Sequence, residues 1–159
     1  MPRRVIPIVL VSLFFLAMLS PAISEGQAVT GTAKTSAPIQ TQETEFQGVV
    51  AELMECKRKE GVLTVKVTFR NTGAESVSMS IETEHGKYQH IYVTADSKKY
   101  FVLKDSEGAP LAPKYLDGTL GKGQKILWWA KFPAPPAEVK KINLIFPKVL
   151  PFEDVPITD

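Results

Sequence analysis

Apolar and polar residues alternate with a period of two along much of the chain after residue 45. In the stretch GVLTVKVTFRNTG, every second residue from Leu63 to Phe69 is apolar, and the residues between them are polar. This alternation predicts a half-buried antiparallel β-strand. The Asn-Thr-Gly that follows is a turn signal, so the strand is expected to end there.

Seven other segments are also expected to form strands, and short Gly, Asp or Ser signals separate several of them. They are FQGVVAELMECKRK, SVSMSIETE, YQHIYVTAD, KKYFVLKD, QKILWWAKF, VKKINLIF and FEDVPIT. Between Leu111 and Leu120 the chain holds Pro113 and several turn formers, so we expect at most one helical turn there. Short strands at this spacing predict an all-β fold, an immunoglobulin-like antiparallel β-sandwich of about seven to eight strands. A closed barrel is the second choice.

The stretch ILWWAKFPAPP places two tryptophans side by side near the end of one predicted strand. Neighbouring side chains of a strand face opposite sides, and the even-numbered positions from Ile126 to Phe132 are all apolar. We therefore expect Trp128 in the core and Trp129 on the outer face. The prolines that follow match the spacing of a polyproline ligand. Because proline cannot donate to a β-ladder, we favour a corner that ends the strand.

The N-terminus reads as an export signal. Arg3 and Arg4 precede an uncharged apolar run, and small residues follow it, so residues 1–24 are predicted to be a cleaved signal peptide. Residues 25–44 are rich in Thr, Ala, Ser and Gln and predict a disordered tether. Residues 45–159 are then one domain. The protein is expected in the periplasm or secreted, without a membrane anchor after cleavage.

Charge and cysteine content narrow the choice of partners. The formal net charge is +2, and Arg3 and Arg4 account for both surplus charges, so the chain without residues 1–24 is formally neutral. A nucleic-acid partner therefore has no electrostatic support. Cys56 is the only cysteine, so no internal disulfide can form. We expect a buried thiol, with an intermolecular disulfide or a reactive thiol as the alternative.

The C-terminal half resembles a known family. The strand ending at VTFRNTG, the Leu-x-x-Gly turn from Leu120 to Gly123, the apolar strand ending at Phe132 and the PFEDVPI segment resemble small exported bacterial immunoglobulin-like domains. These are DUF4352-type domains of unknown function, similar in fold to an immunoprotective extracellular mycobacterial antigen. The resemblance spans about residues 47–157. It implies a two-sheet sandwich outside the cytoplasm and no known activity.

No constellation in the sequence predicts catalysis or a cofactor. The chain has no G-x-S-x-G motif. A catalytic histidine base could only be His85 or His90, because the chain has no other histidine. With Glu82 and Glu84, these histidines could supply metal ligands from the arms of a hairpin. Two strong ligands are too few to assign a metal, so His85 and His90 remain weak candidates. A small-ligand or metal-binding module at this hairpin is the alternative function.

The leading hypothesis is a non-enzymatic exported domain that acts through protein or cell-envelope contacts. Exposed aromatic side chains commonly anchor such contacts. The candidate anchors are Trp129, Tyr88, Tyr92 and Tyr100, although aromatic rings in sandwiches more often pack than bind. The sequence does not define the partner or the oligomeric state.

Overall fold

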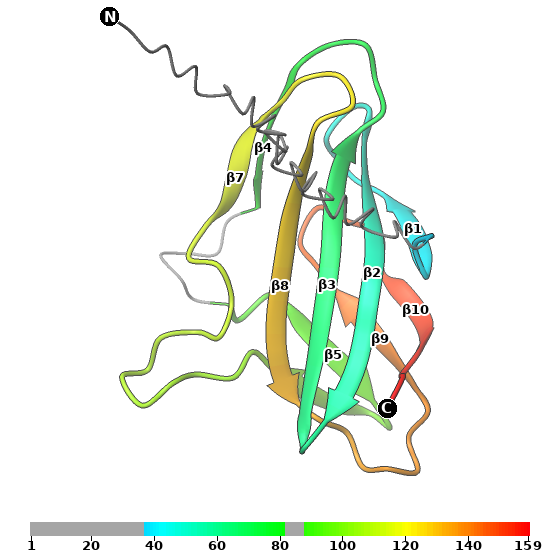
Figure 1. Cartoon of the computed structure of the whole chain (residues 1–159), viewed down its shortest axis with the longest axis vertical. Helices are drawn as coiled ribbons and strands as arrows, with labels where there is room; N and C mark the ends of the chain where they lie inside the picture. Colours follow the sequence, from blue (N-terminus) through cyan, green and yellow to red (C-terminus); the bar gives the residue numbers. More distant parts are fainter. Residues whose placement is uncertain (1–36, 82–87) are drawn as a thin grey trace, which may run out of the picture. The chain divides into compact units, whose positions relative to one another are not determined.

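The computed structural model describes residues 37–81 and 88–159. The predicted signal peptide, most of the predicted tether and His85 lie outside these residues. The described chain forms ten β-strands in three hydrogen-bonded sheets, and no α-helix is found in it (Figure 1). The prediction of an all-β fold is confirmed.

The first sheet has the strand order β1-β2-β3-β8 and is antiparallel throughout. Its strands are β1 (Gln40–Glu43), β2 (Val49–Lys59), β3 (Val62–Asn71) and β8 (Lys125–Pro133). The inward-facing residues of β3 from Leu63 to Phe69 are fully buried, as the alternation predicted. β3 pairs along its whole length with β8. β3 is therefore a central strand of this sheet, and β8 is an edge strand.

The remaining strands form a four-stranded sheet and a two-stranded ribbon. The four-stranded sheet has the order β10-β9-β5-β6, with β10 (Phe152–Pro156), β9 (Lys141–Ile145), β5 (Tyr92–Ala95) and β6 (Lys98–Phe101). The ribbon pairs β4 (Val77–Ile81) with β7 (Leu116–Leu120). Only antiparallel pairs occur between these named strands, and two of the pairings, β5 with β9 and β4 with β7, join strands that are not consecutive in the sequence.

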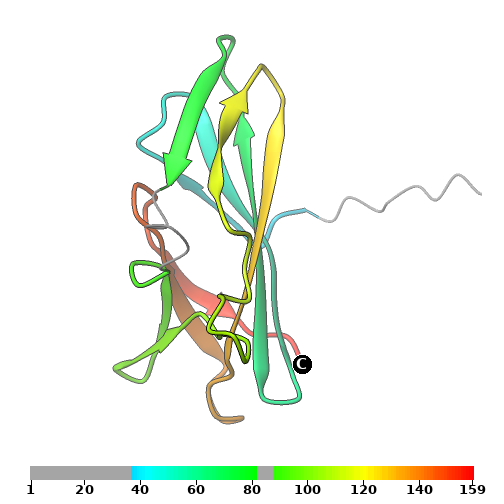
Figure 2. The ribbon, with the colours of Figure 1, turned by 90° about the vertical axis from the view of Figure 1, so that its left-hand side faces the viewer.

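Aromatic side chains join the two four-stranded sheets face to face. Phe146, which follows β9, packs edge-on against Phe69 of β3 with ring centroids 5.9 Å apart, and against Trp128 of β8 at 4.6 Å. Such edge-to-face pairs add to the free energy gained from burying the rings. The buried residues of all three sheets belong to one hydrophobic core. The protein is therefore a β-sandwich, seen from the side in Figure 2.

Two tight turns show how the sequence sets the register of the hairpins. Glu60 and Gly61 connect β2 to β3, and both have positive φ angles, 51° and 77°. Asp96 and Ser97 connect β5 to β6, and their φ angles are also positive, 46° and 63°. Two successive positive φ angles define a type I′ turn, whose twist matches that of paired strands. These turns lie where the sequence placed turn signals.

Two strands were not expected. β1 lies within the stretch that we assigned to the tether, so order begins before residue 45. It pairs with β2, and the side chains of Gln40 and Gln42 donate hydrogen bonds to the carbonyls of Glu153 and Pro151. The segment for which we expected at most a helical turn contains β7 instead.

Candidate interaction surface on the outer sheet face

The outer face of β3 and β8 carries the exposed tryptophan. The four outward-facing side chains from position 125 to 131 of β8 are Lys125, Leu127, Trp129 and Lys131, and we call them the β8 strip. Trp129 is 37% exposed and Leu127 is 58% exposed. Their neighbour Trp128 is 0% exposed, so the alternation separates the two tryptophans as predicted. Two adjacent large apolar groups on an open sheet face form a candidate contact surface.

Ion pairs on this face leave the lysines of the β8 strip without acidic partners. Lys66 of β3 donates to Glu55 of β2 at 2.8 Å, and Arg70 of β3 pairs with Glu52. The Glu52 hydrogen bond raises the pKa of Arg70. Neither lysine of the strip has a carboxylate within ion-pair distance in the described part of the chain. The strip therefore consists of two apolar side chains between two positive charges that no carboxylate of the described residues pairs.

The ring of Trp129 is also without aromatic or cationic contacts among residues 37–81 and 88–159. Its cross-strand neighbour is Lys66, whose ammonium group is held by Glu55. Tryptophan in this setting offers a large amphipathic surface to a partner with little loss of conformational entropy. This is the placement expected of an anchor.

The three tyrosine candidates lie elsewhere. Tyr88 is buried, packs against Trp128 with ring centroids 6.3 Å apart, and donates its hydroxyl proton to the carbonyl of Pro113. Burial raises the pKa of Tyr88. Tyr100 lies opposite the buried Val93 and packs partly against the core. Tyr88 therefore occupies a buried position and Tyr100 a partly buried one, and a role for either in binding stays a prediction.

Tyr92 lies on the outer face of the other sheet. It pairs across the strands with Phe101, at a ring-centroid distance of 5.8 Å, and Phe101 is 48% exposed. The ammonium group of Lys99 lies 4.4 Å from the centroid of the Tyr92 ring. Because a cation already covers this ring, Tyr92 is less available to a partner than Trp129.

The histidine hairpin is only partly described. His85 lies outside the described residues, and His90 is exposed. Within the described residues, no three His, Cys, Asp or Glu side chains come close enough together to hold a metal ion. The metal or small-ligand hypothesis at this hairpin therefore stays a prediction.

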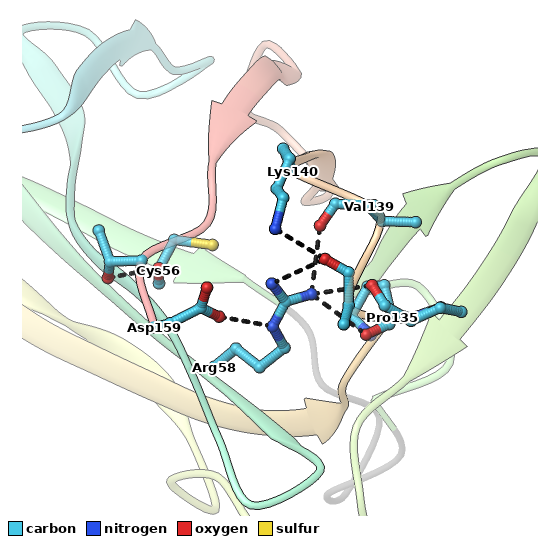
Figure 3. Close-up of polar contacts among 9 residues, drawn as sticks. Cys56, Arg58, Pro135, Val139, Lys140 and Asp159 are labelled. Atoms are coloured by element: carbon cyan, nitrogen blue, oxygen red, sulfur yellow. Dashed lines mark hydrogen bonds and ion pairs between the residues drawn. The ribbon is translucent and has the colours of Figure 1, made fainter.

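The proline-rich stretch after β8 is held by an arginine that the sequence analysis did not single out. The guanidinium group of Arg58, at the end of β2, donates to the carbonyls of Pro136 at 2.8 Å and Val139 at 3.2 Å (Figure 3). It also pairs with Asp159 at 2.7 Å, which raises the pKa of Arg58 and lowers that of Asp159. Pro135 is buried. The stretch is a strand corner, as predicted from its prolines, and it does not present an open polyproline helix.

Cys56 lies beside this corner and is buried. Desolvation raises the pKa of its thiol to about 12, despite the opposing influence of Arg58. Only the thiolate is a good nucleophile or metal ligand. The thiol is therefore protonated and inert at neutral pH in the folded protein.

The surface hollows formed by described residues are open and charged. One, of about 230 Å³, lies between Glu43 and Lys148. Another, of about 350 Å³, lies at the β5–β6 turn and is lined by Asp96, Lys141 and Asp154 among others. Acidic and basic side chains line both hollows, and neither is lined by a histidine or a cysteine among the described residues.

Leu127 and Phe101 were missed as surface candidates. The alternation that placed Trp129 outside also places Leu127 outside, so the signal for Leu127 was present. For Phe101 the signal was weaker, because Tyr100 and Val102 beside it are also apolar. Only the pairing of β5 with β6 determines which of these residues faces outward.

Comparisons with protein-family models, with curated proteins and with solved structures gave no match to this chain. Among the described residues, no helix has the length and apolar character needed to cross a bilayer. The resemblance to DUF4352-type domains therefore stays a prediction.

Proposed function

We propose that this protein is an exported, non-enzymatic binding module that contacts a protein or cell-envelope partner through the outer face of β3 and β8. The proposal rests on the β8 strip, in which Trp129 and Leu127 are exposed between two lysines that form no ion pair within the described part of the chain. Export is supported by the arginine pair and apolar run at the N-terminus. Membership of the DUF4352-type family belongs to the same proposal.

Trp129 has the properties of an interface anchor. Interfaces draw most of their free energy from a few large side chains near the centre of the contact, and tryptophan is enriched among these. Trp129 lies on a sheet built from long paired strands, so its backbone is rigid before binding. Little conformational entropy is then lost when the ring is covered.

Site-specific photo-cross-linking tests this proposal. A p-benzoylphenylalanine residue replaces Leu127 in the full chain, produced in its native host, and the matched control carries it in place of Leu150, which is 55% exposed and far from β8 in sequence. We expect a defined adduct at position 127 that is absent at position 150. The substitution Trp129→Ala should reduce the yield of this adduct. Equal adducts at both positions, or no adduct at position 127, would exclude the outer face of β8 as the contact surface.

A further inference from the structure

The chemistry of the β8 strip indicates what kind of partner it fits. Its side chains follow the order cation, apolar, apolar, cation along one strand, at positions 125, 127, 129 and 131. Alternate residues of a strand are about 7 Å apart, so the charges flank the apolar pair at both ends. A partner that covers Leu127 and Trp129 must therefore also meet Lys125 and Lys131.

The charges of neighbouring residues on β3 indicate that the partner should carry negative charge. Lys125 lies directly opposite Arg70 in the β3–β8 register. Like charges in such a cross-strand pair are destabilising. Glu52 offsets the charge of Arg70, and Glu55 offsets that of Lys66, but no carboxylate of the described chain does so for Lys125 or Lys131. An incoming carboxylate at either end would complete the charge pairing of the face.

A second copy of this chain does not meet the requirement. A two-fold axis that brings Leu127 and Trp129 of two copies together also brings Lys125 of one copy onto Lys131 of the other. Four unpaired lysines would then face one another in two like-charged pairs. Electrostatic complementarity suppresses such wrong partners and favours a partner of opposite charge.

We infer that the β8 strip binds an extended acidic segment of another protein, with carboxylates near Lys125 and Lys131 and apolar side chains over Leu127 and Trp129. This inference rests on the proposed function and adds the chemistry of the partner. A strand-like segment fits because its alternate side chains have the same spacing as those of the strip. The matching sequence pattern has acidic residues at positions i and i+6 and apolar residues at i+2 and i+4.

Two labelled nonapeptides test the inference with the purified protein. The peptide TETVTFTET has this pattern, and TKTVTFTKT reverses only its charges. Fluorescence anisotropy should show saturable binding of the acidic peptide, at least about tenfold tighter than that of the basic one, and weaker binding at high salt. In the variant Lys125→Glu/Lys131→Glu the affinity for the acidic peptide should fall about tenfold.

The matched control is Lys98→Glu/Lys122→Glu, which changes the net charge equally at two exposed lysines outside the strip. It should alter the affinity less than twofold. Equal affinity for the two peptides, no binding of the acidic one, dimerisation of the protein through the strip, or equally strong binding to phosphatidylglycerol vesicles would each overturn the inference. A Leu127 cross-link that persists undiminished in the Lys125→Glu/Lys131→Glu variant would overturn it too, while leaving the proposed function standing.

Discussion

Trp128 and Trp129 are adjacent in the sequence, but Trp128 is buried and Trp129 is exposed. The sequence was enough to assign one ring to the core and the other to the surface, because Lys125 and Lys131 share the parity of Trp129, whereas every even-numbered position from 126 to 132 is apolar. For Tyr100 the sequence alone gave no placement. In its segment several apolar residues are consecutive, so the local pattern does not determine the phase, and only the pairing with Val93 sets it.

Substitution of each tryptophan should separate the two roles. Trp128 is fully buried against Phe146 and Tyr88, so Trp128→Ala should lower the free energy of unfolding by roughly 3–5 kcal/mol. Trp129→Ala removes a side chain that is 37% exposed on the outer face and should cost clearly less than Trp128→Ala. Urea unfolding followed by circular dichroism measures both. A loss at Trp129 as large as that at Trp128 would mean that Trp129 is structural.

The ion pair between Arg58 and Asp159 predicts a pH dependence. Arg58 lowers the pKa of Asp159 below 3.8, its ordinary value. A depressed pKa in the folded state contributes stability that is present above the unfolded pKa and is lost as the pH falls through the folded pKa. Asp159→Asn should therefore destabilise the protein at pH 7, and the difference from the unmodified protein should disappear toward pH 2. Urea titrations at several pH values test this.

Asp117→Asn serves as the control for that experiment. Asp117 is exposed on β7, and no ion pair is found for it in the described chain. Its replacement should change stability little between pH 7 and pH 2. A difference at Asp159 that stays constant over this range would show that the effect comes from something other than the charge of the carboxylate.

At the scale of elements, long strands with clean alternation were predictable, and β1 and β7 were not. β1 has the sequence QTQE, which contains no apolar residue, and it is held by backbone pairing with β2 and by glutamine side chains. β7 has the sequence LDGTL, and its pairing with β4 buries both leucines. The glutamine contacts of β1 and the pairing of β7 both involve residues distant in sequence, and such tertiary context overrides local propensity.

Asn71 shows how one turn residue organises several elements. It is fully buried at the end of β3, and its side-chain amide donates to the carbonyls of Glu75 at 2.6 Å and Leu120 at 2.8 Å. Its side-chain oxygen accepts a hydrogen bond from the amide of Gly73 at 2.8 Å. The sequence indicated a turn here, but it gave no sign that the asparagine also ties the end of β7 to β3.

The near-isosteric change Asn71→Asp tests this role. A carboxylate cannot donate to the two carbonyls, so the variant should lose at least about 3 kcal/mol of stability at pH 7. Burial beside carbonyl oxygens should raise the pKa of the new carboxyl, so part of the stability should return as the pH falls and the group is protonated. Unfolding curves at pH 7 and pH 4 provide the measurement.

Asn143→Asp is the matched control, because the exposed Asn143 uses its side-chain oxygen only to accept from the amide of Asp154 at 2.9 Å. A carboxylate can still accept this bond, so the control should be nearly neutral. An equally small effect at Asn71 would show that its amide donors do not stabilise the corner.

At the scale of the molecule, one core without a disulfide holds the sandwich together. The period of two and the turn signals were enough to predict two packed sheets. The order of the strands was not predictable, because pairings such as β3 with β8 join residues more than fifty positions apart, and no local pattern specifies them. β2 shows that one strand edge can pair with segments from both ends of the chain. β1 pairs with the first half of β2, and the backbone of Thr158 forms hydrogen bonds with Cys56 and Arg58 in the second half.

The position of Cys56 makes it a reporter of how the whole sandwich opens. Cys56 is 1% exposed and its thiol has a pKa of about 12, so Ellman's reagent should modify it only when the fold opens. If the sandwich opens as one unit, the logarithm of the modification rate should rise with urea along the same slope as equilibrium unfolding. A Ser106→Cys/Cys56→Ala variant, with an exposed thiol, should react at once at any urea concentration. Rapid, urea-independent modification of Cys56 would instead show that the 157–159 segment separates from β2 by itself. The ion pair between Arg58 and Asp159 would then stabilise only this edge of the sheet and would not contribute to opening of the whole sandwich.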